Sequence, residues 1–516
     1  MLPVSRPPRT AAASRRPSGW NATGARAYVA ALGTVALVCA TALVTDVAFD
    51  VETLAAIATA LIAVIAVANL ARLGAQIVAP STLFLAALAV FHIGMIAPVA
   101  AGLDDAPTWL LALPEDVIAA SLLAVILAFA AFGIGLVLGW KRTDTKPPSL
   151  TPIADAPRTP SALHGGGLVA ALLAAGASLV NLSAIGFDRF FESSYGYEIY
   201  AATDSRMLQM SFFWMLPTAA LISFAGARRG RESKRALALV GTTVALLLWA
   251  GDRGGAISLL AGTGVAWTAT RGPVPRKIAT IAALSVLVLV PTVATLRQLP
   301  RNALSISSIG EAIEEASPLS ALTEMGASLR PLAETMRIVP SLEPYRYGRS
   351  YLAAATRVAP NLGLSRADDD FSDADELAPD LWITYTVAPW TFAAYGGLGY
   401  SGVAEPYLNF GVLGIVGYFL ALGFVLGRVD LRLAQVPSRR VLAVTAVVFM
   451  SFLLTVRNDI QNFVRPAIWD LALIGIIEVV YGVRSVRTVR RVRRLPAPTR
   501  VAPMRVASRP LARGAA

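Results

Sequence analysis

The segment that organises the rest of the chain is GGLGYSGVAEPYLNFG, residues 396–411, which leads directly into the apolar run VLGIVGYFLALGFVL, residues 412–426. Its glycines permit backbone conformations that other residues resist, and they let a bulky ligand approach the main chain. Glu405, Tyr407 and Asn409 place polar groups at the mouth of a helix that can enter a membrane. Because an ionisable side chain at such a depth is costly, we expect this segment to form the floor of an active site on the non-cytoplasmic face.

Composition identifies the chain as a polytopic membrane protein. Of its 516 residues, 55% are hydrophobic and 15% are charged, and the mean hydropathy is +0.60. Several apolar runs are long enough to cross a hydrocarbon core of about 30 Å as helices. The net charge of +12 would suggest nucleic acid in a soluble protein, but the excess arginine lies in the two tails and in short loops. Cytoplasmic loop bias explains this distribution, so we expect no nucleic-acid partner.

Residues that could bind a metal are scarce. The single cysteine, Cys39, lies in an apolar run, so neither a disulfide nor a thiolate cluster can form. His92 and His164 are far apart in sequence and have no ligand-spaced partners. The acidic run Asp368–Asp370 is typical of a solvated loop. We therefore predict that the protein uses no metal and no other cofactor.

Hydropathy predicts an all-α integral membrane protein with about twelve transmembrane helices and one large, partly helical extracytoplasmic loop. The predicted parts are a disordered basic cytoplasmic tail (1–26), an N-terminal transmembrane bundle of about nine helices (27–296), the loop with amphipathic helices (297–405), three C-terminal transmembrane helices (406–484) and a basic cytoplasmic tail (485–516). The predicted helices cover residues 27–45, 53–71, 81–101, 117–139, 165–185, 208–226, 236–250, 255–270, 278–296, 406–427, 441–457 and 467–484.

The charges of the connections set the predicted orientation. With both ends in the cytoplasm, the inner connections are rich in arginine or lysine and the outer ones are acidic or mixed, as the positive-inside rule requires. The inner connections are 141–164, 228–235, 271–277 and 428–440, and the outer ones include 46–52, 102–116 and 186–207. The arginines from Arg484 onward are expected to attract anionic membrane lipid. The predicted location is a cytoplasmic membrane, with the active site outside.

One outer loop, from Arg297 to about Pro389, is far longer than a connection between helices needs, and such loops are usually functional or disordered. Residues 309–339 carry apolar side chains at helical spacing, which predicts an amphipathic helix on the membrane surface or on the bundle. Residues 345–364 combine tyrosines with arginines, and residues 367–380 form an acidic, turn-rich piece.

These residues resemble a known family. The motifs YGRSY (347–351) and RVAPN (357–361), followed by residues 397–411 and the last three apolar runs, are similar to the Wzy-type O-antigen and exopolysaccharide repeat-unit polymerases. The likeness is best over the C-terminal half. It implies a GT-C-like, multispanning glycosyltransferase that joins undecaprenyl-pyrophosphate-linked oligosaccharides into a chain at the outer leaflet. It also implies a flippase and a chain-length regulator as possible partners.

The residues fit that chemistry. Cationic groups must bind a lipid pyrophosphate donor, and the rigid fork of arginine suits phosphate oxygens. A carboxylate in an apolar site can remove the proton of the acceptor hydroxyl. Our first candidate for this base is Glu405, with Asp380 and Asp459 behind it. The predicted substrate-binding residues are Arg253, Arg297, Arg349, Arg357, Arg457, Arg465, Tyr351, Tyr407 and Asn409.

Each feature also has a simpler explanation. Glu405 could cap the helix that follows it, because a carboxylate is favourable at a helix N-terminus. Arg253 could lie in an exposed turn, Arg457 and Arg465 could bind lipid headgroups or Asp459, and the loop arginines and tyrosines could form an interfacial belt.

Two other functions remain possible. A glycan ligase of this type usually depends on a histidine in the large outer loop, and this loop has none. A transporter or flippase of lipid-linked sugars predicts internal repeats and ionisable residues at the middle of spans. We find no convincing repeat, and the polar residues cluster at one face.

Overall fold

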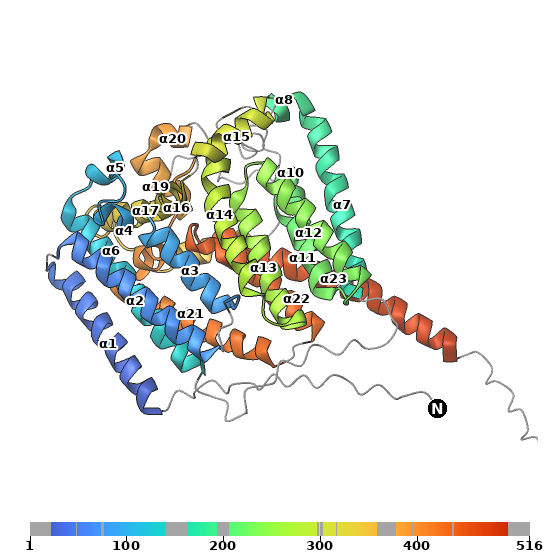
Figure 1. Cartoon of the computed structure of the whole chain (residues 1–516), viewed down its shortest axis with the longest axis horizontal. Coiled ribbons are helices and arrows are strands. Elements are labelled where there is room, and N and C mark those ends of the chain that lie inside the picture. The colour runs from blue at the N-terminus through green and yellow to red at the C-terminus, as the bar shows by residue number, and fades with distance from the viewer. Residues whose placement is uncertain are drawn as a thin grey trace, which may run out of the picture.

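The computed structural model describes residues 22–47, 49–73, 77–140, 162–192, 206–296, 299, 303–315, 317–358, 378–393, 396–435 and 438–493. Within these ranges the protein is built from helices and contains no strand (Figure 1). The all-helical class predicted from the sequence is therefore confirmed. Arg297, the acidic run from Asp368 and most of the two predicted tails lie outside the described residues.

Every segment expected to cross the membrane is helical. The helices are α1 (Ala22–Thr45), α2 (Val51–Arg72), α3 (Pro80–Ile93), α6 (Glu115–Trp140), α7 (Ala162–Ile185), the π-helix η1 (Gln209–Met215) with α11 (Leu216–Gly226), α12 (Arg231–Trp249), α13 (Arg253–Arg271), α14 (Arg276–Leu296), α21 (Ala404–Ala434), α22 (Arg439–Leu453) and α23 (Gln461–Arg493). The short helices α4 (Ile96–Ala100), α5 (Thr108–Leu111), α8 (Phe187–Glu192) and α10 (Arg206–Leu208) lie between them. At the two ends, α1 begins earlier and α23 ends later than expected.

Among the described residues, seven helices are long and apolar enough to cross a membrane: α1, α2, α6, α7, α14, α21 and α22 with its 3-10 extension η6 (Leu454–Val456). The remaining expected spans form helices that are shorter or less apolar. Helix α12, for example, starts with four charged residues among its first five, and α11 is buried along its whole length among other helices. The protein is thus a multispanning membrane protein, and the number of spans that length and apolarity support is smaller than the predicted twelve.

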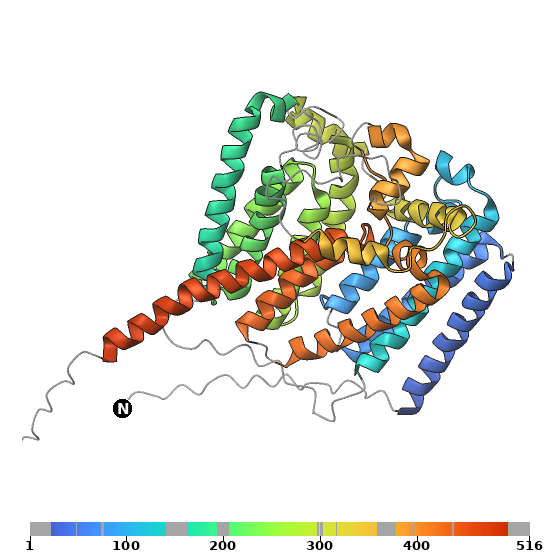
Figure 2. The same ribbon diagram turned by 180° about the vertical axis from the view of Figure 1, so that it is seen from behind.

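The central contact of the bundle joins α6 and α21, which run side by side (Figure 2). Both helices carry two glycines four residues apart, Gly135 and Gly139 on α6 and Gly423 and Gly427 on α21. A Cβ atom at Gly135 or Gly423 would clash with main-chain atoms of the other helix. Small residues at this spacing let two helices approach closely inside a membrane. The contact therefore fixes α21, and with it the glycine-rich segment 396–411 that leads into this helix.

The large loop folds into a set of short helices that cover one end of the bundle (Figure 1). They are α15 (Ile306–Glu315), α16 (Pro318–Met325), the 3-10 turn η3 (Gly326–Ser328), α17 (Leu329–Ile338), α18 (Arg349–Thr356), α19 (Pro379–Val387) and α20 (Pro389–Ala393). The helical spacing expected over 309–339 is divided among α15, α16, η3 and α17. Helix α16 begins at Pro318, because proline disfavours helical geometry in the residue before it. That residue, Ser317, accepts a hydrogen bond from the amide of Leu319.

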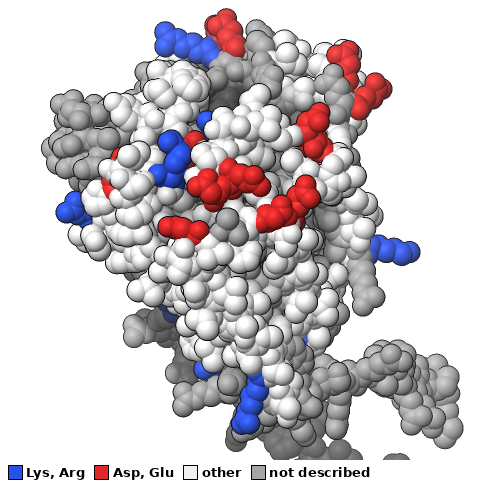
Figure 3. Space-filling view, turned by 90° about the vertical axis from the view of Figure 1, so that its left-hand side faces the viewer, with Lys and Arg blue, Asp and Glu red and all other residues white. Residues whose placement is uncertain are grey.

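The surface of the molecule fits a membrane position. Apolar side chains of α1 and α7, such as Leu37, Val44, Leu172 and Val180, are exposed, as expected for contact with lipid. On the face that Figure 3 shows, acidic side chains gather in the upper half, where several basic side chains also lie. A broad, mostly uncharged surface lies below them, with a few basic side chains toward its lower edge. The upper half is the end that the loop helices cover.

Candidate active site

A break in α21 brings the loop onto the start of this helix. Phe410 (φ −140°, ψ 15°) and Gly411 (φ 62°, ψ −147°) leave helical geometry, so the helix divides into a first piece, 404–409, and a long second piece. The carbonyls of Leu408 and Asn409, at the end of the first piece, accept from the backbone N–H groups of Arg346 (2.9 Å) and Tyr347 (3.0 Å). The Arg346–Tyr347 segment thus satisfies carbonyls that the break would otherwise leave without partners.

Glu405 lies in the first piece of α21 and is 4% exposed. Its Oε1 accepts from the hydroxyl of Ser350 and its Oε2 from the amide of Ile460, both at 2.7 Å. Asn409 completes the group, because its Nδ2 donates to Ser350 Oγ (2.8 Å) and its Oδ1 accepts from Gly348 N (2.9 Å). Glu405 therefore connects three parts of the chain.

These bonds show how the Glu405 carboxyl is held. The amides at the start of α21, those of Val403 and Ala404, donate to Ser401 Oγ over 3.1 Å and 3.2 Å. Ser401 thus takes the place of the side-chain cap, and the hydrogen bonds of the Glu405 carboxyl go to other elements. Glu405 still lies in the first turn of α21, where a carboxylate is favourable, so both interpretations from the sequence stay predictions.

Asp459 is fully buried directly before Ile460. Its Oδ1 accepts from the backbone N–H (3.3 Å) and Nδ2 (3.0 Å) of Asn462, and no N–H of the described residues donates to its buried Oδ2. The charge of Asp459 acts on both Glu405 and Asp380. The three predicted catalytic carboxyl groups, at positions 380, 405 and 459, therefore lie together.

Asp380, at the start of α19, is coupled to Asp459. Its removal from water raises the pKa of its carboxyl well above the ordinary value, and the negative charge of Asp459 and a hydrogen bond between the two carboxyl groups raise it further. The amide of Leu381 and Nδ2 of Asn462 oppose this effect on the pKa. The Asp380 carboxyl therefore gives up its proton less readily than an ordinary aspartate does.

Arg346 and Tyr400 lie beside the carboxyl groups. Arg346 is one of the loop arginines that the sequence indicates, whereas Tyr400 was not singled out. The guanidinium carbon of Arg346 lies 4.9 Å from the ring centroid of the buried Trp382, and its charge acts on Glu405. Tyr400 is fully buried, its amide donates to Arg457 O (2.6 Å) and its hydroxyl lies 3.3 Å from Thr335 Oγ1. Burial raises the pKa of Tyr400, and the charge of Glu405 adds to this.

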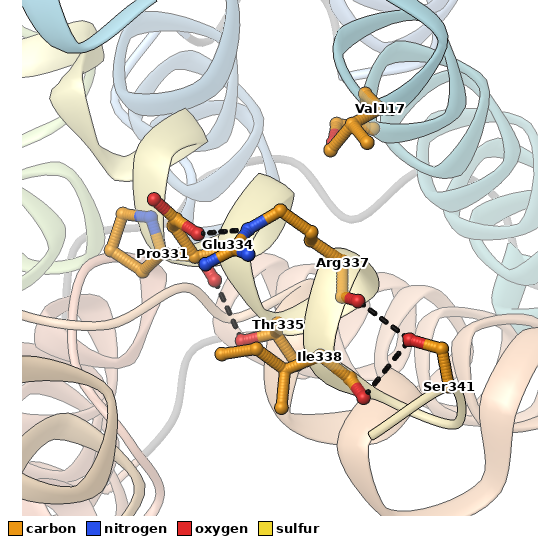
Figure 4. Close-up of polar contacts among 8 residues, drawn as sticks. Val117, Pro331, Glu334, Thr335, Arg337, Ile338 and Ser341 are labelled. Carbon is orange, nitrogen blue, oxygen red and sulfur yellow. Dashed lines mark hydrogen bonds and ion pairs between the residues drawn. The ribbon is translucent and has the colours of Figure 1, made fainter. Parts of the chain in front are cut away.

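Helix α17 supplies Thr335 to this site and carries an ion pair on another face (Figure 4). Arg337 Nε lies 2.7 Å from Oε2 of Glu334, which is a buried residue. Ser341 donates to the carbonyls of Arg337 and Ile338 at the end of the helix. Figure 4 shows the Glu334–Arg337 pair along α17. Glu334 therefore serves as a reference for Glu405, because it is also a buried glutamate with a hydrogen-bonding partner but lies outside the three-carboxyl cluster.

Three of the predicted arginines lie next to the cluster. Arg357 Nη1 donates to Gln461 Oε1 (2.7 Å), one residue after the amide that Glu405 binds. Arg457 is half-buried, with its guanidinium 6.0 Å from the ring of Phe91, and its carbonyl accepts from Tyr400. Arg349 is exposed and immediately precedes Ser350. These three cations lie along the segments that hold the carboxyl groups.

The other predicted binding residues make contacts of their own. Arg253 is buried, with Nη2 2.5 Å from Glu324 Oε1 and Nη1 donating to Val290 O. The guanidinium of Arg465 lies 5.5 Å from the ring of Trp214. Tyr407 donates to Val339 O (3.2 Å), and the ring of Tyr351 stacks on Phe410. None of these contacts by itself assigns a role in substrate binding.

The described residues contain no group of three or more His, Cys, Asp or Glu side chains arranged to hold a metal ion. What the site offers is acid–base chemistry from clustered carboxyl groups, beside cations that can bind an anion. The family model described as O-antigen polysaccharide polymerase Wzy matches residues 29–488, a range that includes every residue of the site. No curated protein and no solved structure matches the chain.

Proposed function

Because this chain belongs to the O-antigen polysaccharide polymerase Wzy family, we propose that it joins undecaprenyl-pyrophosphate-linked oligosaccharide repeat units into a polysaccharide on the outer face of the cytoplasmic membrane. The proposal includes a GT-C-like bundle of about twelve spans with both termini in the cytoplasm, since helices shorter than a full span can still cross inside a bundle. A flippase that delivers the repeat unit and a regulator of chain length are the proposed partners.

The proposed reaction is a glycosyl transfer between two lipid-linked units. The hydroxyl oxygen of the acceptor attacks the anomeric carbon of the donor and forms the new glycosidic bond. The bond from that carbon to the pyrophosphate oxygen breaks, and its electron pair leaves on the lipid pyrophosphate. The hydroxyl proton passes to a carboxylate, which later returns it to water. Such a reaction needs a base near the acceptor and cations near the leaving group.

We assign the base to Glu405. The Ser350 hydroxyl and the Ile460 amide hold its carboxylate in one orientation, which limits the reorganisation needed when the proton is transferred. Asp380 and Asp459 are the further candidates for the base, and burial raises the pKa of the Asp380 carboxyl. Arg349, Arg357 and Arg457 are the proposed pyrophosphate ligands near the cluster, and Arg253, Arg297 and Arg465 remain further candidates, with Tyr351, Tyr407 and Asn409 proposed for sugar binding.

The observation that carries the proposal is the convergence of the three carboxyl groups with Arg346 where the loop meets α21. These groups come from sequence positions 346, 380, 405 and 459, and the loop, α19, α21 and the turn before α23 each contribute one of them. Buried charged groups are expensive, so a cluster of this kind in a membrane protein favours a functional site.

The test is polymerisation by the purified protein in nanodiscs, supplied with a lipid-pyrophosphate-linked repeat unit and followed as a glycan ladder on a gel. Glu405→Gln removes the proposed base and should abolish the ladder. Glu334→Gln is the matched control, because Glu334 is also a buried, hydrogen-bonded glutamate but lies outside the cluster. A ladder that survives Glu405→Gln would exclude Glu405 as the base. No ladder from folded wild-type protein would count against the polymerase itself.

One observation favours the alternative of a lipid-linked-sugar transporter. Asp430 and Asp470 are buried within α21 and α23, and Asp470 accepts from the hydroxyls of Thr218 (2.7 Å) and Ser451 (2.9 Å). Ionisable residues inside spans are common on transport pathways. The same nanodisc protein, placed in vesicles, would have to move the lipid-linked unit across the bilayer, and Asp470→Asn would have to stop that movement, for this alternative to replace the polymerase.

A further inference from the structure

A histidine of α3 is hydrogen-bonded to the residue that caps α21. His92 and Ser401 are both fully buried, and His92 Nε2 lies 2.8 Å from Ser401 Oγ. The other ring nitrogen, Nδ1, lies 3.0 Å from the carbonyl oxygen of Leu88. A carbonyl can only accept, so Nδ1 carries the proton, and in the neutral imidazole Nε2 accepts from the Ser401 hydroxyl. The ring of His92 therefore determines the direction in which Ser401 donates.

Ser401 uses its remaining hydrogen-bonding capacity at the start of α21. While its hydroxyl proton goes to His92, its Oγ accepts from the amides of Val403 and Ala404. These amides are the donors that the first turn of a helix leaves without intrahelical partners. The carbonyl of Ser401 also accepts from the amide of Glu405 (3.2 Å). A continuous series of hydrogen bonds thus runs from His92 to the backbone of the proposed base.

The same segment is held on its other side by the chain that carries Asp459. Tyr400 N donates to Arg457 O and Gly402 N donates to Val456 O (3.2 Å), so Ser401 lies between two backbone hydrogen bonds to η6 and its following turn. Those bonds fix the backbone of residues 400–402, but they do not fix the side chain of Ser401. His92 supplies that restraint from a separate helix.

We propose that His92 is a positioning residue for the transfer: by accepting the Ser401 hydroxyl it holds the first turn of α21 in the orientation in which Glu405 meets Ser350 and Ile460. The inference rests on the proposed function, because it assumes that Glu405 is the base. His92 is assigned no contact with substrate. A small change in the direction of a catalytic group lowers the rate of the chemical step more than it lowers binding.

The test compares two substitutions of His92 in the nanodisc polymerisation assay. His92→Leu removes the acceptor, and it should lower kcat by up to about 10²-fold with KM changed by less than about twofold. His92→Gln offers Oε1 to the same hydroxyl, so it should recover most of the rate. Ser401→Ala removes the same hydrogen bond and also the acceptor of the Val403 and Ala404 amides, so it should lower kcat at least as far as His92→Leu. Because Ser401→Ala already removes the bond to His92, the double variant should be no slower than Ser401→Ala alone.

The chain supplies a matched control in its other histidine. His164 is also buried and also contacts a serine, with Nδ1 3.2 Å from Ser223 O and 3.0 Å from Ser223 Oγ, at the contact of α7 with α11. His164→Leu should lower the melting temperature without lowering kcat per folded molecule. This variant measures what the loss of a buried histidine–serine contact does to stability alone.

The outcomes separate this inference from the function on which it rests. Equal kcat in wild type and His92→Leu, or losses that add in the double variant, would overturn the positioning role and leave the polymerase intact. A wild-type protein that forms no polymer would remove both. If His92→Leu does not fold, Ser401→Ala tests the positioning role in its place. A kcat equal to that of wild type would then show that the Ser401 hydroxyl has no part in the reaction.

Discussion

The hydroxyl of Ser350 donates to Oε1 of Glu405 over 2.7 Å, although the two residues are 55 positions apart in the chain. Ser350 stands in the first turn of α18, next to the exposed Arg349, and Glu405 stands in the first turn of α21. This bond joins the long loop to the membrane bundle at the proposed base. Any motion that separates the loop from α21 must therefore break it.

Removal of that hydroxyl should slow the reaction. Ser350→Ala leaves one oxygen of a buried carboxylate without its donor, and a hydrogen bond to a charged group contributes about 1.5–3 kcal/mol. If the bond is present in the transition state, kcat should fall by about 10- to 100-fold. Ser341→Ala is the control, because Ser341 is exposed and donates only to carbonyls at the end of α17 (Figure 4). Equal rates for the two variants would contradict the prediction.

Stability should depend on pH through Asp380. Its pKa is raised in the folded protein, so the folded state holds a proton that the unfolded state loses near pH 4. The contribution of Asp380 to the free energy of unfolding is therefore fully present below the pKa of the unfolded state. It declines as pH rises toward the pKa of the folded state. Asp380→Asn removes the titration, so its melting temperature should exceed that of wild type by an amount that grows from pH 4 to pH 8. A difference that is constant with pH would contradict the assignment.

The break in α21 should require glycine at position 411. The backbone of Gly411 lies in a region that other residues rarely occupy, and a Cβ there would meet the hydroxyl of Tyr345 at 3.0 Å. Gly411→Ala should destabilise the protein by about 1–3 kcal/mol. Gly417→Ala, in the same helix with nothing near its Cβ, should be neutral or stabilising. Melting temperatures of the two variants, measured in the same nanodiscs, provide the comparison, and equal values would contradict the prediction.

The ion pair of Arg253 with Glu324 offers a test of the predicted phosphate role. If Arg253 binds the donor, Arg253→Ala should raise KM for the lipid-linked unit, whereas Glu324→Gln, which keeps the arginine, should leave KM unchanged or lower it. If the pair serves only to hold α16 on α13, both variants should lower the melting temperature by a similar amount and leave KM unchanged. Steady-state kinetics beside thermal melts distinguish these results.

Much of the architecture is decided locally and could be predicted. Apolar runs fix where helices form, because each run must satisfy its own backbone hydrogen bonds in lipid. The polar section after residue 296 and the glycines before Glu405 likewise indicate where the bundle is interrupted. The carboxyl groups at 380, 405 and 459 could be singled out because ionisable residues near spans are rare. The break before Pro318 was not predicted, because the helical spacing of apolar residues continues across it.

The sequence by itself determined the class of the protein, the positions of its helices and the residue types available for chemistry, because hydropathy and local conformation act over a few neighbouring residues. Only the tertiary structure decided which side chains meet. The sequence does not distinguish Arg346 from Arg349 or Arg357. Only the structure shows that the backbone N–H of Arg346 donates to the carbonyl of Leu408. The partnership of His92 with Ser401 spans 309 positions. Such contacts depend on how helices and loop pack together, and no local pattern records that packing.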